Sequence, residues 1–349
     1  MSAVLERELV APEAAPERRP VSTRLLWLGA CTAVVIALVL ASVAFGTRAV
    51  SWHELVTAFT GTEEGVAQAA VQARVPRTVL AVLIGAALAV SGAVMQGVTR
   101  NPLADPGILG VNMGASLAVV TGIAFFGLTD PTGYVWVAML GAASAATFVY
   151  AVGSLGRGGA TPLKLALAGA ATAAALTSLV SAILLPRIAV MDTFRFWQIG
   201  GVGGATYDRI GHVLPFLAVG FALSLLAARW LNALALGDDL AVGLGERVGL
   251  VRAIAALGAV VLCGAATAAA GPIAFVGLVV PHLCRLLVGV DHRWLLPFSA
   301  LVGAGLLVAS DIAGRLVARP EEVDVGIITA LIGAPFFIYV VRRSKVREL

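Results

Sequence analysis

The chain has 349 residues, of which 59% are hydrophobic and only 13% are charged, with a formal net charge of +4 at pH 7. An ordinary soluble domain is about half apolar, so this composition excludes a soluble fold and predicts an integral membrane protein. The apolar residues form long solid runs. They do not form the alternating segments of about 10 residues that an outer-membrane barrel requires. The basic residues are scattered, which argues against nucleic-acid binding.

Ten long apolar segments follow one another along the chain. An α-helix rises about 1.5 Å per residue, so a run of about 20 apolar residues crosses the hydrocarbon core of a bilayer. We therefore predict an all-α integral membrane protein with about ten transmembrane helices. In chain order, these helices are expected at residues 25–45, 75–98, 109–128, 133–152, 163–185, 210–231, 251–270, 272–288, 294–313 and 325–341.

The charged segments divide the chain into three parts. Residues 1–24 are predicted to be a disordered cytoplasmic tail, and residues 342–349 (RRSKVREL) a second cytoplasmic tail. The transmembrane domain occupies residues 25–341 and carries a polar insert at 232–250 (NALALGDDLAVGLGERVGL). The insert has a helix–Gly–helix pattern.

Two further segments are predicted to lie at the membrane surface. Residues 51–60 (SWHELVTAFT) are expected to form a short surface helix, with Ser51 as N-cap and Glu54 as its capping-box partner. Residues 186–208 are amphipathic and rich in aromatic residues, which is typical of an interfacial segment.

The distribution of basic residues orients the predicted helices. With the N-terminus in the cytoplasm, sixteen of the 24 Lys and Arg residues fall in cytoplasmic segments and eight in outer ones. Cytoplasmic loops of membrane proteins carry an excess of Lys and Arg. This bias favours a chain with both termini in the cytoplasm.

An internal repeat connects the two halves of the chain. Residues 101–109 (NPLADPGIL) interrupt the apolar pattern and parallel residues 271–279 (GPIAFVGLV) in their proline, alanine, glycine and aliphatic positions. The freed backbone groups of such a break cannot face lipid. Because the preceding helices run in opposite directions, the segments from 75–98 to 163–185 and from 251–270 to 325–341 are predicted to form an inverted repeat, as in many transporters.

The sequence holds none of the common catalytic motifs. Neither lysine, Lys164 or Lys345, follows a glycine-rich phosphate-binding loop, and no GxSxG or HExxH motif occurs. Asp, Glu, Lys and Arg are expected to be absent from the middle of the helices. We therefore expect no catalytic residue, no metal site and no cofactor bound by this chain.

Two groups of polar residues have open interpretations. Arg74 and Arg77 lie three apart at the outer end of the helix at 75–98, and Arg315 lies on the same side. They are either interfacial anchors or a contact for acidic residues of an outside partner. The insert at 232–250 is either a connector or a docking element for a cytoplasmic motor.

Several motifs in order resemble one known family. The phrases RVPR, GAALAVSGAVMQG, NPLADPGILGVNMGAS, ALGDDLAVGLG, GPIAFVGLVVPHLCRLLVGVDHRWLLP, SDIAGR and GIITALIGAPFFIYV are similar to those of the ABC-importer permeases for iron–siderophore complexes, haem and cobalamin, the FecCD type. The resemblance covers nearly the whole chain from about residue 25.

The resemblance implies a set of partners. Permeases of this type pair as two identical or paralogous subunits around a central pathway. Two ATPase subunits, which bind ATP and Mg, dock on the cytoplasmic side. A periplasmic or lipid-anchored binding protein delivers the ligand from outside.

The resemblance also implies roles for particular residues. Docking of the binding protein is assigned to Arg74, Arg77 and Arg315. Coupling to the ATPases is assigned to the segment 235–249, with Leu236, Gly237, Asp238, Asp239, Leu240, Gly243 and Gly245. A cytoplasmic gate is assigned to Thr161, Pro162 and Leu163. The pathway is lined mainly by the helices at 163–185 and 325–341, with Gly169 and Thr172 on the first of them.

These expectations combine into one functional hypothesis. The chain is expected to be the permease subunit of an ATP-driven importer in the bacterial cytoplasmic (inner) membrane, with ferric-siderophore complexes as the favoured cargo. Cobalamin or haem is the alternative cargo. An ion-coupled secondary transporter is a further alternative, but it requires a buried ionisable relay near the midplane. A membrane scaffold or receptor without transport activity is a third.

Overall fold

The computed structural model describes residues 20–48, 50, 51, 53, 54, 56, 65–156 and 161–343. Within these residues the regular structure is helical throughout. The predicted capping box is present, because the Ser51 hydroxyl accepts from the Glu54 N–H at 3.3 Å and the Glu54 carboxylate accepts from the Ser51 N–H at 2.8 Å. The rest of the predicted surface helix, from residue 57 to residue 60, lies outside the described residues, as do residues 1–19 and 344–349.

Each of the ten predicted apolar segments coincides with a helix. In chain order, the main helices are α1 (Val21–Ala44), α3 (Val66–Thr99), η1 (Pro106–Leu109), α4 (Val111–Phe126), α5 (Pro131–Ser154), α6 (Pro162–Leu184), α7 (Ile188–Ile199), α8 (Tyr207–Leu234), α9 (Asp238–Gly243), α10 (Val248–Ala270), α11 (Val276–Val288), α12 (His292–Val317) and α13 (Val325–Arg343). The predicted interfacial segment contains α7.

Local sequence explains where many helices begin. Asp130, Thr161, Thr206 and Asp291 each accept a hydrogen bond from a backbone N–H in the first turn of α5, α6, α8 and α12, respectively. Such N-caps satisfy one of the N–H groups that a helix start leaves without a partner. Proline follows the cap of α5 and of α6, where its missing N–H costs nothing.

Two helix starts differ from the prediction for reasons that lie in the local sequence. α3 begins at Val66, because residues 66–74 are good helix formers and the helix continues through Pro76. α11 begins at Val276, four residues later than expected. The preceding segment contains Gly271 and Phe275, whose φ angles of 71° and 68° are incompatible with a right-handed helix.

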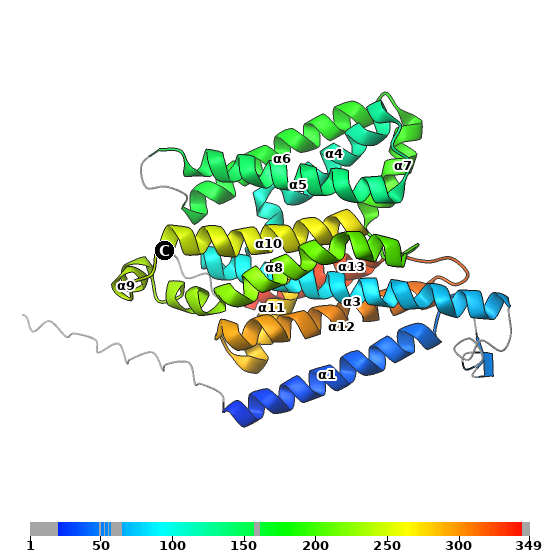
Figure 1. Ribbon diagram of the computed structural model, residues 1–349, viewed down its shortest axis with the longest axis horizontal. Coiled ribbons are helices and arrows are strands. Elements are labelled where there is room, and N and C mark those ends of the chain that lie inside the picture. Colours follow the sequence, from blue (N-terminus) through cyan, green and yellow to red (C-terminus); the bar gives the residue numbers. More distant parts are fainter. Residues whose placement is uncertain are drawn as a thin grey trace, which may run out of the picture.

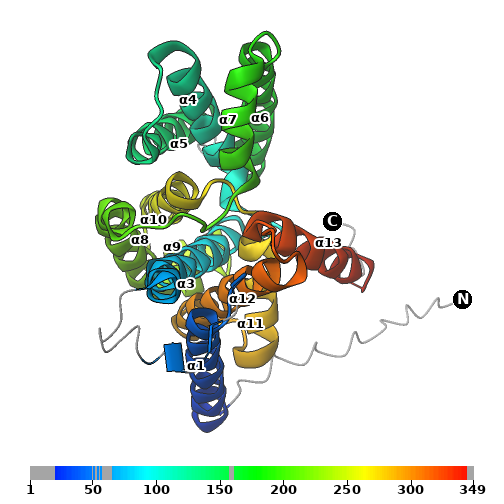
Figure 2. The same ribbon diagram turned by 90° about the vertical axis from the view of Figure 1, so that its right-hand side faces the viewer.

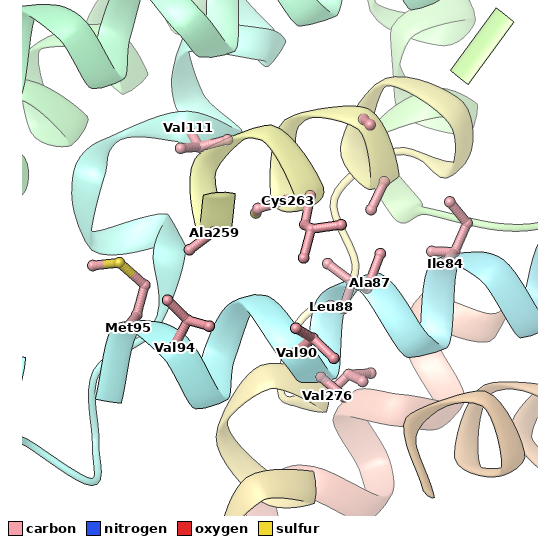
Figure 3. Close-up of a cluster of buried hydrophobic side chains, with 14 of the residues drawn as sticks. Ile84, Ala87, Leu88, Val90, Val94, Met95, Val111, Ala259, Cys263 and Val276 are labelled. Carbon is pink, nitrogen blue, oxygen red and sulfur yellow. The ribbon is translucent and has the colours of Figure 1, made fainter. Parts of the chain in front are cut away.

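The helices are arranged around α3. Of the most apolar part of α3, 78% of the residues are buried, compared with 6% for α1 at the periphery. Figure 2 shows α4 to α7 as a separate group and α3 at the centre of the remaining helices. Figure 3 shows the contact between α3 and α10, where Val94 of α3 lies toward Ala259 of α10, whereas Val90 lies toward Val276 of α11.

The packing follows the predicted inverted repeat. α3, the first helix of the first half, packs on α11 and α12 of the second half, and α10 packs on α4 and α5 of the first. Figure 1 shows α3 and α10 side by side, running in opposite directions. Each half therefore inserts its first helix into the other half.

The two breaks are also used in the same way. A Cβ atom on Gly169 of α6 would overlap the carbonyl oxygen of Ile108 in the first break, and one on Gly333 of α13 would overlap Phe275 in the second. The last helix of each half thus approaches the break of its own half through a glycine. Close backbone approach of this kind is a common use of small residues in membrane proteins.

Seven of the described helices are long and apolar enough to cross a bilayer, namely α1, α3, α5, α6, α8, α10 and α12. Three others, α4, α11 and α13, are apolar but shorter. α4 and α11 are short because the irregular residues of a break precede each of them. These ten helices are the ten that hydropathy predicts.

Candidate functional site

The three predicted docking arginines come together at one end of the helix bundle, around Asp311 of α12. The Asp311 carboxylate is 1% exposed and receives a hydrogen bond from Arg77 Nε at 2.9 Å. Arg77 Nη2 and Arg315 Nη2 each lie 2.8 Å from an Asp311 oxygen. Arg77 Nη1 also contacts Glu322 at 2.6 Å. Asp311 lies within the last two turns of α12. The residues between Arg293 and Asp311 carry no charge, so the middle of this helix is uncharged, as predicted.

Arg74 and Arg315 bind the C-terminal end of α1. Arg74 donates to the carbonyl oxygens of Val43 and Ala44 at 3.1 and 2.9 Å. Arg315 donates to those of Ser42 and Phe45 at 3.0 and 2.9 Å. The last four carbonyl groups of a helix have no partner within the helix. The two guanidinium groups supply those partners and attach peripheral α1 to α3 and α12.

This geometry bears on the docking hypothesis. Arg74 and Arg315 are 7% and 2% exposed and hydrogen-bonded within the chain, so in this conformation their guanidinium groups do not face the outside. Arg77 is more accessible, with 14% of its side chain exposed, and it also pairs with Glu322, whose side chain is 39% exposed. The docking role of the three arginines stays a prediction. Sequence reasoning missed Asp311 and Glu322, although Asp311 lies four residues before Arg315, a spacing that pairs side chains on a helix.

The predicted coupling segment lies at the opposite end of the bundle (Figure 1). α9 is a single helix of six residues. The helix–Gly–helix pattern predicts a first helix at residues 234–236, and this is wrong, because Leu234 ends α8 and residues 235 and 236 form a turn before Gly237. Gly237 and Gly245 have φ angles of 110° and 86°, which favour glycine. Around α9 four aliphatic side chains are exposed, those of Leu236, Leu240, Val242 and Leu244.

Within this segment, Asp238 and Asp239 have different surroundings. Asp238 forms ion pairs with Arg100 at the end of α3 and with Arg252 of α10. Asp239 is exposed. Gly243 is the last residue of α9, and a Cβ atom there would meet open space.

A polar cluster joins α8 to the start of α12 at the same end. Asn232 Nδ2 donates to Asp291 at 2.6 Å, and the His292 N–H donates to Asn232 Oδ1 at 2.9 Å. Burial raises the pKa of Asp291, but hydrogen bonds from Asn232 and the Arg293 N–H outweigh this, so the pKa lies below its ordinary value. The sequence analysis did not detect this cluster, because its members are far apart in the chain.

The predicted gate residues stand at the start of α6. Thr161 is the N-cap, Pro162 is the first helical residue, and the Leu163 side chain is exposed. Further along α6, Gly169 contacts the first break, as described above. The Thr172 hydroxyl donates to the Ala168 carbonyl at 2.7 Å, so its polar group is satisfied within the helix. The gating and pathway roles stay predictions.

Two apolar cavities lie beside α5, one between helices of the first half and one between α5 and α10 of the second half. One, of about 740 Å³, is an open pocket lined by α4, α5 and α6, with Thr172 and Phe126 in its wall. Another of about 420 Å³ lies between α5 and α10 beside Tyr150. Few residues of α6 are buried, namely Leu165, Gly169 and Val180. Among the described residues, His, Cys, Asp and Glu do not gather in a group of three that could hold a metal ion.

The fold and its two ends define a class of protein. A polytopic helical bundle with an inverted repeat and broken helices has the architecture of a membrane transporter. Residues 34–343 match the model of the FecCD transport family, so the chain belongs to this family, as its motifs predict. It is therefore a multi-pass membrane permease.

Similar proteins agree with this assignment. The chain is 48% identical over 272 residues to the iron(3+)-hydroxamate import system permease protein FhuB of Bacillus subtilis, covering 78% of this chain and 71% of that protein. It is 44% identical to the ferric enterobactin transport system permease protein FepD of Escherichia coli, covering 87% and 91%. A solved chain described as an inward-facing conformation of a metal-chelate type ABC transporter has a TM-score of 0.80 at 28% identity, covering 92% and 99%.

Proposed function

We propose that the chain is a permease subunit of an ATP-driven importer that takes ferric-siderophore complexes from an extracytoplasmic binding protein and passes them to the cytoplasm. The observation that supports this choice of cargo is the similarity to two permeases named for ferric siderophores, at 48% and 44% identity. The likeness to a metal-chelate type ABC transporter across nearly the whole chain supports the same reading.

The proposed location is the bacterial cytoplasmic membrane, with both termini in the cytoplasm. The excess of basic residues in the inner segments supports this orientation. It is also consistent with the fold, in which the arginine cluster and α9 lie at opposite ends of the bundle (Figure 1). The first would face the binding protein and the second the cytoplasm.

A second permease subunit, identical or paralogous, is proposed to cover α6 and α13. Only 11% of the most apolar part of α6 is buried in the single chain. The exposed surface of α6 includes Thr177, Ser178 and Ser181, whose hydroxyl groups donate to carbonyl oxygens of their own helix. A wall of small residues with satisfied polar groups would let a bulky chelate pass without binding it tightly.

ATP hydrolysis is proposed to take place on two separate ATPase subunits, which would bind ATP and Mg and dock on α9. Support comes from the exposed aliphatic side chains around this short helix. Surface patches of this kind are typical of interaction sites. In this proposal Leu236, Leu240 and the glycines around them form the contact, and α9 transmits the motion.

For docking of the binding protein, we propose Arg77 as the leading contact. It already holds the partly exposed carboxylate of Glu322, which a carboxylate of a partner could replace. Replacing Arg77 with Gln is expected to weaken binding by about tenfold or more, because a charge-assisted contact is lost. The affinity of the co-encoded binding protein for the chain in nanodiscs measures the effect.

The matched control is Arg195→Gln, which removes one exposed positive charge from α7 at the same end. It should leave the affinity unchanged at a fixed salt concentration. Equal affinities for the Arg77 variant and the wild-type protein would contradict the docking role.

Reconstitution tests the function as a whole. Proteoliposomes with the chain, its ATPase and its binding protein are given radiolabelled ferric enterobactin, a ferric hydroxamate, haem or cobalamin, with ionophores present. Uptake of a ferric siderophore that requires ATP and persists with ionophores is the expected result. Uptake that ionophores abolish without any need for ATP would favour an ion-coupled transporter, and absence of flux for every ligand would favour a scaffold or receptor.

The alternative cargo, cobalamin or haem, is distinguished in the same experiment. ATP-dependent uptake of either, without uptake of the ferric siderophores, would replace the proposed cargo while leaving the permease function intact. The ion-coupled alternative requires a titratable group near the midplane. The buried pair of Asp311 and Arg315 does not meet this requirement, because the two groups neutralise each other near a helix end.

A further inference from the structure

The short helix α9 has little apolar attachment to the rest of the protein. Of its six residues only Ala241 is buried, and its main neighbours are α8 and α10. Burial of one small side chain contributes little to holding a helix in place. Other contacts must therefore couple the position of α9 to the positions of the transmembrane helices.

Asp238, the first residue of α9, supplies such contacts to both halves of the repeat. Its carboxylate forms an ion pair with Arg100, the residue that ends α3 in a left-handed conformation with a φ of 52°. Arg252 Nη2, near the start of α10, lies 2.9 and 3.1 Å from the two carboxylate oxygens. α3 and α10 are the first helices of the two halves, so one side chain joins α9 to both.

From Arg100 a stretch of hydrogen-bonded turns leads to the predicted pathway helix. The Leu103 N–H donates to Asn101 Oδ1 at 2.9 Å, and the Gly107 N–H donates to Asp105 Oδ1 at 2.8 Å. The stretch ends in η1, where the Ile108 carbonyl lies against Gly169 of α6. A displacement of Arg100 would thus reach α6 through short, hydrogen-bonded turns.

We propose that Asp238 is the positioning residue that connects the coupling helix to both halves of the permease, and through residues 100–109 to α6. That the ATPases move α9 rests on the proposed function, whereas the contacts that join Asp238 to α3 and α10 do not. The side chains of Asp238 and Arg100 are 45% and 37% exposed. Exposed ion pairs are weak enough to break and re-form, which suits a joint that moves during a transport cycle.

The connection is tested first on the full chain alone, in nanodiscs, by hydrogen–deuterium exchange. Asp238→Asn should make the amides of 238–244 and of 100–109 exchange about two- to fivefold faster, as expected for loss of an exposed ion pair. Asp239→Asn is the matched control, because it removes the same charge from the neighbouring exposed position. If the two variants exchange alike, or if only 238–244 changes, the proposed connection is wrong.

A double-mutant cycle adds a second readout. Arg100→Gln should speed exchange in the wild-type background and have little further effect once Asp238 is Asn. Arg247→Gln, at an exposed position of the same segment, controls for the loss of a positive charge. Additive effects of the Asp238 and Arg100 variants would contradict the ion pair as the connecting element.

The third readout uses the complex with its ATPase and binding protein, supplied with radiolabelled ferric enterobactin or a ferric hydroxamate. Asp238→Asn should lower the ligand transported per ATP hydrolysed at least threefold, while ATPase binding is retained. Asp192→Asn, at an exposed position of α7 outside the coupling segment, should leave this ratio unchanged. If the wild-type complex neither hydrolyses ATP nor transports, the proposed function fails, and the exchange experiments still decide whether Asp238 connects the two segments.

Discussion

Replacing Asp311 with Asn will strongly lower the stability of the folded chain. The Asp311 carboxylate is buried between Arg77 and Arg315, and Arg315 is itself buried. Removing one partner of a buried ion pair leaves an uncompensated charge and typically costs about 3–5 kcal/mol. Here Arg315 loses its counter-charge while Arg77 keeps Glu322, and the attachment of α1 through Arg315 weakens as a result.

The matched control for this prediction is Glu322→Gln. Glu322 is partly exposed, and within the described part of the chain its ion pair is with Arg77, so its loss should cost about 0–1 kcal/mol. Thermal unfolding of both variants in the same detergent, followed by loss of helical circular dichroism, gives the comparison. Equal shifts of the two variants would show that the Asp311 cluster does not hold this end of the bundle together.

The second large effect is expected from Gly169→Val. The Ile108 carbonyl oxygen occupies the space that a Cβ atom on Gly169 would need. A larger side chain must push α6 away from η1, and overpacking of this kind costs about 1–3 kcal/mol. Since α6 is the proposed wall of the pathway, ATP-dependent uptake should fall by more than about tenfold, in line with such a cost.

Gly333→Val tests the same contact in the second half, where α13 meets Phe275. It should impair uptake to a similar degree, because the two halves use the same contact. Gly211→Val is the control, since a Cβ atom at Gly211 of α8 meets no other atom within 4 Å. Membrane insertion of all variants is checked by quantifying the purified chain. Normal uptake by the Gly169 variant would show that α6 does not depend on close contact with the first break.

Much of the fold could be predicted from the sequence. Hydropathy located all ten apolar helices, because the requirement for about 20 apolar residues acts on each segment independently of its neighbours. Helix starts such as that of α6 were also readable, since Thr161 and Pro162 cap the helix locally. The parallel between the two breaks predicted the inverted repeat, which appears in the structure as the exchange of α3 and α10 between the halves.

The candidate site was only partly predictable. The sequence pointed to Arg74, Arg77 and Arg315, and the structure brings them together. Their partners could not be read from the chain, because Arg77 and Asp311 are 234 positions apart and Arg315 binds α1 carbonyls across 270 positions or more. Asp238 and Arg100 are separated by 138 positions. Such pairs form only when helices pack.

The sequence by itself determined the membrane class, the helices, the repeat and the family, because each depends on local composition or on motifs read in order. Only the tertiary structure decided which way the polar side chains turn. In the structure Arg74 and Arg315 turn inward to the end of α1, because unpaired helix carbonyls and a buried carboxylate attract guanidinium groups. The position of an arginine in the sequence does not indicate such partners. The structure also distinguishes Asp238, which joins two helices, from Asp239, whose identical carboxylate faces the solvent.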